Sequence, residues 1–284
     1  MPIGSYNATF QIPSVEDVLG GFDVPVASKA VPDSGEIVCL GGSSYGGFEN
    51  AARDSHCRLC LRMGYEIGPN NVWLLPTKSR MPYPYSSLFS IASMMMTEKV
   101  QGRKADWFFW LDDDVLVQPD VYSRLRAVAD AQDRPFVAAV GIDRFPPFRV
   151  AAWSQFMAGE VVSRKQWIVP DGPCNSWKYE LAGNEMWMPI EGVHEVSCTG
   201  LCAAIFHRSL FDRVPQPWFA ATPGTADEKG VEHRLNPDAW WCQKLNEAGI
   251  KAYVDASTAV VHIGDKIPVA IETVPIFRNI FRKR

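Results

Sequence analysis

The chain has 284 residues, of which 47% are hydrophobic and 21% charged, and its formal net charge is −4. This composition is typical of a folded globular protein, and the mild negative charge argues against a nucleic-acid binder that relies on a broad basic surface. No apolar run is long enough for a membrane span, and the N-terminus lacks a secretion signal's features, so we expect a cytoplasmic protein. The seven cysteines, an odd number, favour thiols over a disulfide framework.

The first half of the chain alternates predicted strands and helices. Residues 1–34, rich in Pro, Gly and Ser, are expected to form an extended arm. Short apolar runs predict strands at 37–40, 72–75, 107–111 and 136–141. Helical spacing of apolar residues predicts helices at 48–64, 85–100 and 121–132. Such alternation predicts an α/β fold with a mostly parallel central sheet and helices on both faces.

The second half is less regular at first. Residues 145–195 are rich in aromatic residues, Pro and Gly but show little periodicity, and we expect them to carry a binding surface. Regular segments return at 196–206, at a predicted helix over 238–248, and at predicted extended segments over 251–255 and 259–262. We therefore predict one domain over residues 35–265, in two halves that meet near residue 145, and a basic tail over 266–284.

Three consecutive carboxylates follow the most apolar of the predicted strands. Asp112, Asp113 and Asp114 repel one another, and like charges this close raise each other's pKa unless a cation lies among them. Open parallel sheets bind ligands beyond the carboxyl ends of their strands, which is where this cluster falls. The pattern favours a Mg²⁺ or Mn²⁺ ion held by one or two carboxylates together with a substrate diphosphate.

Two other metal-related interpretations receive less support. A haloacid-dehalogenase-type phosphatase requires Thr or Val two places after its second Asp, and Leu116 stands there when Asp114 is that residue. The pairs Cys57/Cys60 and Cys198/Cys202 could meet around zinc, but they lie in apolar stretches where cysteine packs as a small hydrophobic residue. A plain solvated turn is the remaining alternative for the three aspartates.

Three blocks of sequence resemble GT-A glycosyltransferases, specifically the family 2-like group with many phage-encoded members. The first is 106–119, which contains an Asp-x-Asp strand and a trailing Pro. The second is 196–214 with Pro217-Trp-Phe219, similar to the family's glycine-centred acceptor-side strand and the helix after it. The third is 238–249 followed by 253–257 and His262-Ile-Gly264, similar to the family's Glu-Asp helix and terminal metal-binding histidine.

The resemblance implies a role for each matching residue around a metal-bound donor. Asp112 would contact the ribose or donor sugar and help hold the metal, and Asp114 would bind the Mn²⁺ or Mg²⁺ that bridges the donor's diphosphate. His262 would be a further metal ligand, and Asp113 a second donor-binding residue. Other donor-binding positions implied by the resemblance or by their place at strand ends are Gly41, Arg144 and Gly200.

Asp238 matches the Asp of the Glu-Asp motif, which is the general base in inverting members of the family. The Glu of that motif is Pro237 here, so Glu232 and Asp227 stay open as alternative bases. Asp238 could also act as the N-cap of its helix, since Asn236-Pro237-Asp238 is a common helix opening. The family's Arg-Asn pair at the start of the second helix has no counterpart here.

The function expected from the resemblance is transfer of a sugar from a nucleotide-sugar, a UDP-sugar first, to a hydroxyl acceptor. A nucleotidyltransferase is disfavoured because the Gly41–Gly47 loop carries no Lys or Arg to grip a triphosphate. A non-catalytic nucleotide-sugar binder is the alternative from a different class.

The acceptor is left open between two classes. Similarity to phage members makes a hydroxymethylated DNA base one candidate, in the host cytoplasm, with the basic tail near phosphate. A polysaccharide or a protein is the other. Aromatic side chains that could stack on the acceptor are Trp240 and Trp241, together with Trp153, Trp167, Trp177 and Trp187.

Overall fold

The computed structural model describes thirteen stretches of the chain. They are residues 35–42, 50–74, 92–99, 102–141, 149–153, 166–168, 176–181, 184–189, 192–220, 225–226, 232–233, 237–264 and 267–269. The predicted arm over 1–34, the basic cluster at Arg282–Arg284 and Arg144 lie outside them. Within the described residues, no helix combines the length and apolarity that crossing a membrane requires.

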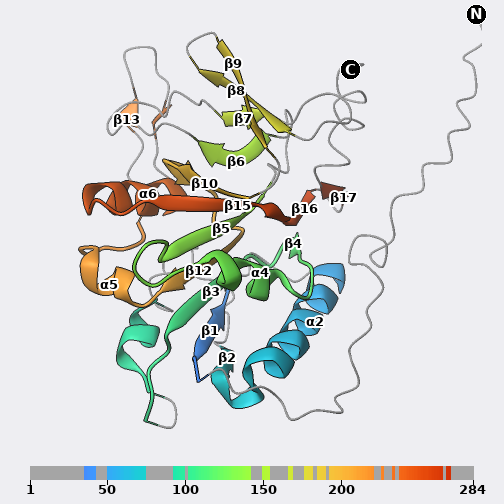
Figure 1. Cartoon of the computed structure of the whole chain (residues 1–284), viewed down its shortest axis with the longest axis vertical. Coiled ribbons are helices and arrows are strands. Elements are labelled where there is room, and N and C mark those ends of the chain that lie inside the picture. Colours follow the sequence, from blue (N-terminus) through green and yellow to red (C-terminus); the bar gives the residue numbers. More distant parts are fainter. Residues whose placement is uncertain are drawn as a thin grey trace, which may run out of the picture.

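A seven-stranded sheet forms the centre of the molecule (Figure 1). Its order is β10-β15-β5-β12-β3-β1-β2. The strands are β1 Val38–Gly41, β2 Val72–Leu74, β3 Trp107–Leu111, β5 Phe136–Val140, β10 Val193–Val196, β12 Ala203–His207 and β15 Ala252–Ala259. The strands β2, β1, β3, β5 and β15 run in one direction, whereas β12 and β10 run against their neighbours. The predicted α/β fold with a mostly parallel sheet is confirmed, and it is consistent with the Rossmann-like GT-A fold.

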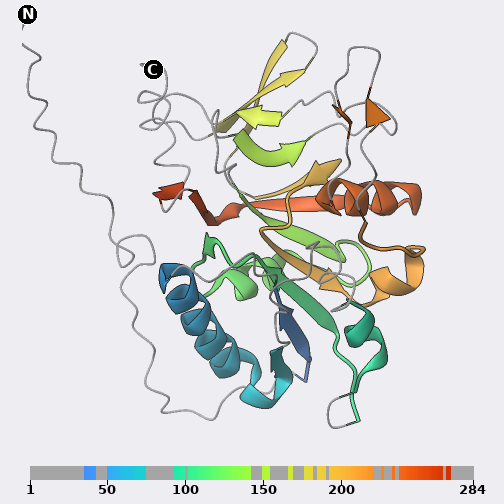
Figure 2. The ribbon, with the colours of Figure 1, turned by 180° about the vertical axis from the view of Figure 1, so that it is seen from behind.

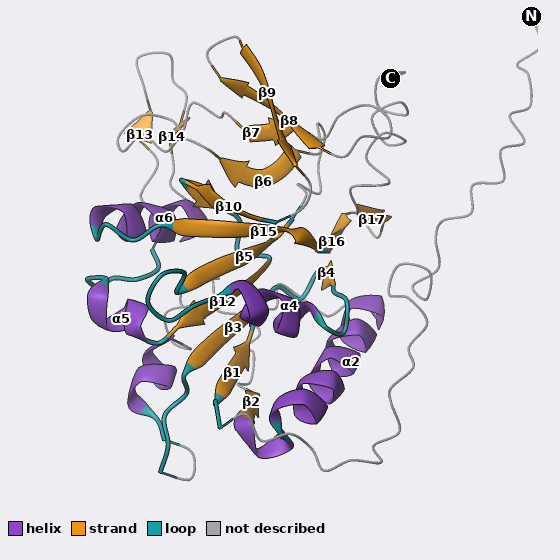
Figure 3. Cartoon of the chain, viewed as in Figure 1, coloured by secondary structure: helices purple, strands orange, loops and turns teal. Residues whose placement is uncertain are grey.

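Helices cover both faces of this sheet, as predicted (Figures 1 and 3). The described helices are α2 Asn50–Ile67, the 3₁₀ helix η1 Pro69–Asn71, a helical segment over 92–97, α4 Val121–Val128, α5 Ser209–Arg213 and α6 Pro237–Glu247. Successive strand residues point to opposite faces. Phe109 of β3 therefore packs with Leu59 of α2 and Tyr122 of α4, whereas Phe108 packs in the other core layer with Phe211 of α5.

The face covered by α5 and α6 is mainly aromatic. Trp241 of α6 is fully buried, with its ring centroid 5.0 Å from that of Phe219 and 5.5 Å from that of Phe206. Phe211 and Phe136 complete the cluster around it, at 5.8 Å and 6.1 Å. Large rings of this kind contribute much of the hydrophobic stabilisation of a core, so α6 is firmly anchored on the sheet.

Most predicted elements are present with shifted ends. The helix expected at 48–64 is described from Asn50 and continues to Ile67, because Gly64 does not end it and Gly68, at φ +90°, does. The helix expected at 121–132 ends at Val128, and the strand expected at 251–255 extends to Ala259. The helix expected at 85–100 is described only over 92–97.

Residues 145–195 contain strands that the sequence does not predict. A second, antiparallel sheet has the order β11-β6-β7-β8-β9. Its strands are β6 Arg149–Trp153, β7 Gln166–Ile168, β8 Ser176–Leu181, β9 Asn184–Pro189 and β11 Cys198–Thr199. Figure 2 shows this sheet from behind, beyond β10 and α6. A two-stranded pair, β13 Thr225–Ala226 with β14 Glu232–His233, lies in the same half of the chain.

A small three-stranded sheet brings together strands from distant parts of the sequence. It has the order β17-β16-β4, with β4 Val115–Leu116, β16 Val261–Gly264 and β17 Ile267–Val269. The chain leaves β15 at Val260, whose N–H donates to the carbonyl of Val140 at the end of β5 over 2.9 Å, and continues as β16 alongside β4. This crossing brings the end of the domain next to the three aspartates.

Candidate metal and donor site

The aspartate cluster occupies the carboxyl end of β3, a strand whose five residues are all buried. The N–H of Asp112 donates to the carbonyl of Cys202 over 2.9 Å, which extends the pairing of β3 with β12 by one residue. The indole Nε1 of Trp110 donates to Oδ1 of Asp112 over 2.9 Å. Trp110 is fully buried, so the orientation of the Asp112 carboxylate is fixed from within the core.

His262 reaches this cluster through the pairing of β16 with β4. In that pairing His262 lies opposite Val115, and the N–H of Ile263 donates to the carbonyl of Asp114 over 2.8 Å. As a result, Nε2 of His262 is 3.5 Å from Oδ1 of Asp114. Two residues separated by almost 150 positions in the sequence, both expected to bind metal, are thus in direct contact.

Asp238 belongs to the same group of acids. It lies in the first turn of α6, and backbone N–H groups of Leu201 and of Asp238 itself donate to its carboxylate. Burial raises the pKa of Asp238 to about 6, while these hydrogen bonds and the charge of His262 act in the opposite direction. A carboxyl group with a pKa near neutrality suits proton transfer.

The pKa of Asp112 is raised as well. Burial raises it well above the ordinary value, and the charges of Asp238 and Asp114 raise it further. The charge of His262 and the hydrogen bond from Trp110 lower it only partly. Carboxylates that disfavour each other's ionised form gain most from a bound cation, so the electrostatics fit a divalent metal ion.

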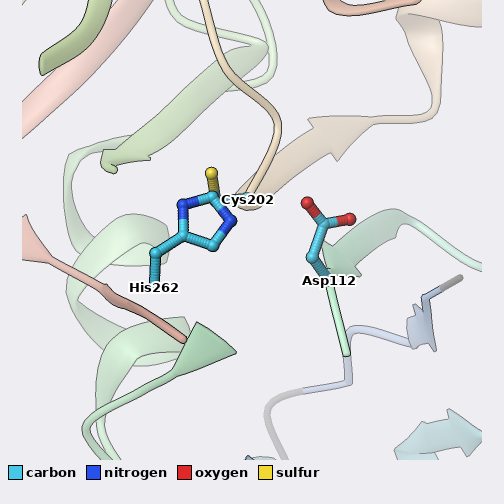
Figure 4. Close-up of side chains that lie close together, drawn as sticks. All are labelled: Asp112, Cys202 and His262. Atoms are coloured by element: carbon cyan, nitrogen blue, oxygen red, sulfur yellow. The ribbon is translucent and has the colours of Figure 1, made fainter. Parts of the chain in front are cut away.

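A ligand set with three different donor atoms is present at this point. The ligand atoms of Asp112, Cys202 and His262 all lie within 4.8 Å of one another, and the side chains face a common space (Figure 4). Among the described residues, the cysteines at 57 and 60 are not part of a metal-ligating group. The thiol of Cys198 instead contacts that of Cys242. The described residues therefore give no support to the four-cysteine zinc site.

The predicted donor-binding residues differ in how closely they approach this site. Gly41 ends β1 beside Trp110, one strand away from the aspartates. Gly200 is buried two residues before Cys202, and its N–H donates to the carbonyl of Ala151 over 2.8 Å. Asp113 is 5% exposed and lies in the turn between β3 and β4.

The two tryptophans expected to stack on the acceptor have different environments. Trp241 is fully buried in the aromatic core, so its ring has no surface available to an acceptor, and this prediction is corrected. Adjacent residues on a helix point about 100° apart, so the two tryptophans do not share one environment. Trp240 is partly exposed, with its Nε1 donating to the carbonyl of Pro217 over 2.9 Å and Lys244 5.4 Å from its ring. Trp240 stays the acceptor-side prediction.

Three contributors to the site were not found from the sequence. Trp110 could have been noticed, because it precedes Asp112 by two residues and therefore faces the same side of the strand. Cys202 was considered only as half of a cysteine pair. Nε2 of His56, on α2, is 3.0 Å from the carbonyl of Val115 and fixes the strand after the aspartates, a contact that only the tertiary structure reveals.

Comparisons with known proteins place few constraints on this chain. No family model and no curated protein matches it. A solved structure of A197 from STIV is similar over 81% of this chain and 87% of that one, at 13% identity and a TM-score of 0.43. A glycosyltransferase involved in the glycosylation of the major capsid of PBCV-1 is similar over 64% and 69%, at 13% identity and a TM-score of 0.30. At this level of similarity, function has to be argued from the site itself.

Proposed function

We propose that this chain is a metal-dependent glycosyltransferase that moves a sugar from a nucleotide-sugar, first a UDP-sugar, to a hydroxyl acceptor. The observation that carries the proposal is the meeting of Asp112, Asp114, His262 and Asp238 at the carboxyl end of β3. β1 has β2 on one side and β3 on the other, and ligands of open α/β sheets bind where the strand order reverses in this way.

The residues around the aspartates fit a bound Mn²⁺ or Mg²⁺ ion. Asp114 and His262 would hold it, with Asp112 as a third ligand or as a contact to the donor's ribose or sugar. The ion supplies positive charge that stabilises the departing diphosphate. Asp113 and the glycines Gly41 and Gly200 would border the donor.

Asp238 would act as the general base of the transfer. Its carboxylate takes the proton of the acceptor hydroxyl, the acceptor oxygen forms a bond to the anomeric carbon, and the bond to the nucleoside diphosphate breaks. A direct displacement of this kind inverts the anomeric configuration. The raised pKa of Asp238 makes it a stronger base than an exposed aspartate.

The proposal is tested by measuring the hydrolysis of a panel of UDP-sugars with the purified chain, with chelator and with added Mn²⁺. Metal-dependent release of UDP from one donor supports the enzyme. Tight UDP binding without release of UDP from any donor, in the presence of acceptors, identifies a binding protein and overturns the proposal.

The acceptor that we propose to test first is a hydroxymethylated DNA base, with a polysaccharide and a protein as the competing classes. The sequence resemblance to phage-type members supports this order. Labelled UDP-sugar is incubated with hydroxymethyl-containing DNA, with unmodified DNA as the matched control, and with a set of glycans. Label transferred only to glycans would reject the DNA acceptor while leaving glycosyl transfer in place.

A further inference from the structure

Cys202 is held at the metal site by its neighbours in the sheet. It directly precedes β12, and its carbonyl accepts the N–H of Asp112 over 2.9 Å. The side chain is 6% exposed. The thiol is therefore fixed beside the Asp112 carboxylate by the same strand pairing that positions the aspartates.

The space occupied by the sulfur depends on a glycine in the neighbouring strand. A Cβ atom built on Gly141, which follows β5, would lie 2.8 Å from Sγ of Cys202. That distance is below any normal contact, so only the absence of a side chain at position 141 leaves room for the sulfur in its observed position. The thiol then shares a common space with the imidazole of His262 (Figure 4).

We propose that Cys202 is a thiolate ligand of the metal ion, together with Asp112 and His262, and that the site therefore prefers a borderline ion such as Zn²⁺ or Co²⁺ to Mg²⁺. Ligand atoms about 2.0–2.3 Å from one ion lie roughly 3.3–3.8 Å apart in a tetrahedral site. The three ligand atoms lie within 4.8 Å of one another, so they can share one ion after their separations shorten by up to about 1 Å. Sulfur ligands disfavour Mg²⁺, which selects oxygen.

Binding of the ion converts the Cys202 thiol to a thiolate and releases its proton to solvent. The inference deepens the proposed function, since it concerns the same metal site and rests on that function for the presence of an ion. Its test uses the metal alone, without a sugar donor, so that the thiolate ligand and the proposed glycosyltransferase function can each be refuted independently of the other.

The experiment is a titration of the metal-free full-length chain with Co²⁺, monitored by absorption. A cobalt–thiolate bond produces a near-ultraviolet charge-transfer band that oxygen and nitrogen ligands do not give. We expect the band in the wild type and its loss in Cys202→Ser, with affinity weakened at least about tenfold, since even outer partners of metal ligands change affinity 10–100-fold.

Two cysteine variants serve as matched controls. Cys39 is fully buried in β1, and burial raises the pKa of its thiol to about 12, so Cys39→Ser is expected to keep the band. Cys57 is exposed on α2, and Cys57→Ser reveals any adventitious binding at the surface. A band that survives in Cys202→Ser, or that never forms when Co²⁺ binds the wild type, overturns the thiolate ligand.

Gly141→Ala tests the geometry while keeping the thiol. The added methyl group is expected to displace Sγ and to weaken the charge-transfer band, while circular dichroism verifies that the variant is folded. Competition completes the test: Zn²⁺ should displace Co²⁺ at equal concentration, and Mg²⁺ should not. Displacement by equimolar Mg²⁺ would contradict the proposal even if UDP-sugar turnover is found, whereas a normal band without turnover would refute only the proposed function.

Discussion

The two ends of strand β3 hold their carboxylates in opposite ways. At the amino end, Oδ2 of Asp106 accepts the backbone N–H of Ile37 over 2.8 Å. Beside it, Glu36 forms a salt bridge with Arg126, whose guanidinium lies 4.5 Å from the ring of Trp107. Each acid at this end has a cation or a backbone donor as its partner.

At the carboxyl end, acids surround one another. Asp112 is bordered by the charges of Asp114 and Asp238, and both raise its pKa. A positive charge on His262 acts in the opposite direction and lowers the pKa of Asp112. The acids at the amino end of β3 are neutralised by partners, whereas those at the carboxyl end repel one another. Without a bound cation, the crowded carboxyl end therefore lowers the free energy of unfolding. That difference is why we propose a ligand site at the carboxyl end and a stabilising role for the acids at the amino end.

The largest effect is expected from Asp114→Asn. The change keeps the shape of the side chain but removes a negative charge that would hold the ion, so donor turnover should fall at least about 10³-fold. Steady-state UDP release at saturating Mn²⁺ measures it, and thermal unfolding verifies the fold. Turnover within a few-fold of the wild type would contradict the proposal that the carboxyl end of β3, unlike its amino end, binds the ion.

Asp238→Asn should lower kcat about 10²-fold, because the residue would act on the acceptor proton, and should weaken Mn²⁺ binding much less than Asp114→Asn does, because Asp238 is not a proposed ligand. Single-turnover rates and calorimetric titration with Mn²⁺ separate these two quantities. A near-normal rate would remove Asp238 as the base and direct attention to Glu232 and Asp227.

The stability of the metal-free chain should depend on pH through Asp238. Its pKa is about 6 in the fold against 3.8 as the reference, so the native state binds the proton more tightly. Stability contributed by this proton is present at low pH and is lost as pH rises through about 6. Asp112, with its raised pKa, acts in the same direction.

Urea denaturation in chelator at about pH 4 and about pH 7 measures this dependence. The loss of stability on raising the pH should be smaller in Asp238→Asn, by at most roughly 3 kcal/mol. Equal losses in the variant and the wild type would show that the pKa of Asp238 is not raised in the folded protein.

The smallest effect is expected at the amino end of β3. Asp106→Ala leaves the N–H of Ile37, a buried residue, without its acceptor, which should cost about 1–2 kcal/mol of unfolding free energy. Turnover per folded molecule should be unchanged. Loss of activity in this variant at full folding would contradict the division between the ends.

The spacing of apolar residues predicts the central strands and helices, because in these elements the local sequence pattern matches the burial of each residue in the fold. The run at β3 is apolar throughout, and a fully buried strand produces that pattern. The antiparallel direction of β12 was not predicted, since strand direction depends on how the chain returns to the sheet. The strands of residues 145–195 were missed because aromatic and polar residues follow one another there without a clear period.

The sequence predicts those residues of the candidate site that stand out by their charge. Three adjacent aspartates after a buried strand are conspicuous in any sequence, whereas the third donor atom, on Cys202, sits in an apolar stretch and depends on Gly141 for its place. Trp241 illustrates the opposite case. Its sequence neighbour Trp240 shares its chemistry, and only the rotation of α6 decides which of the two is buried.

The pairing of β4 with β16 makes the stability of this part of the fold depend on the bound ion. The ligands of the proposed ion come from both sides of this pairing, with Asp112 and Asp114 before β4 and His262 on β16. An ion that binds only when both sides are in place stabilises their association by an amount that grows with its concentration. The concentration of the metal ion would then set how firmly β16 is held against the turn that carries the aspartates.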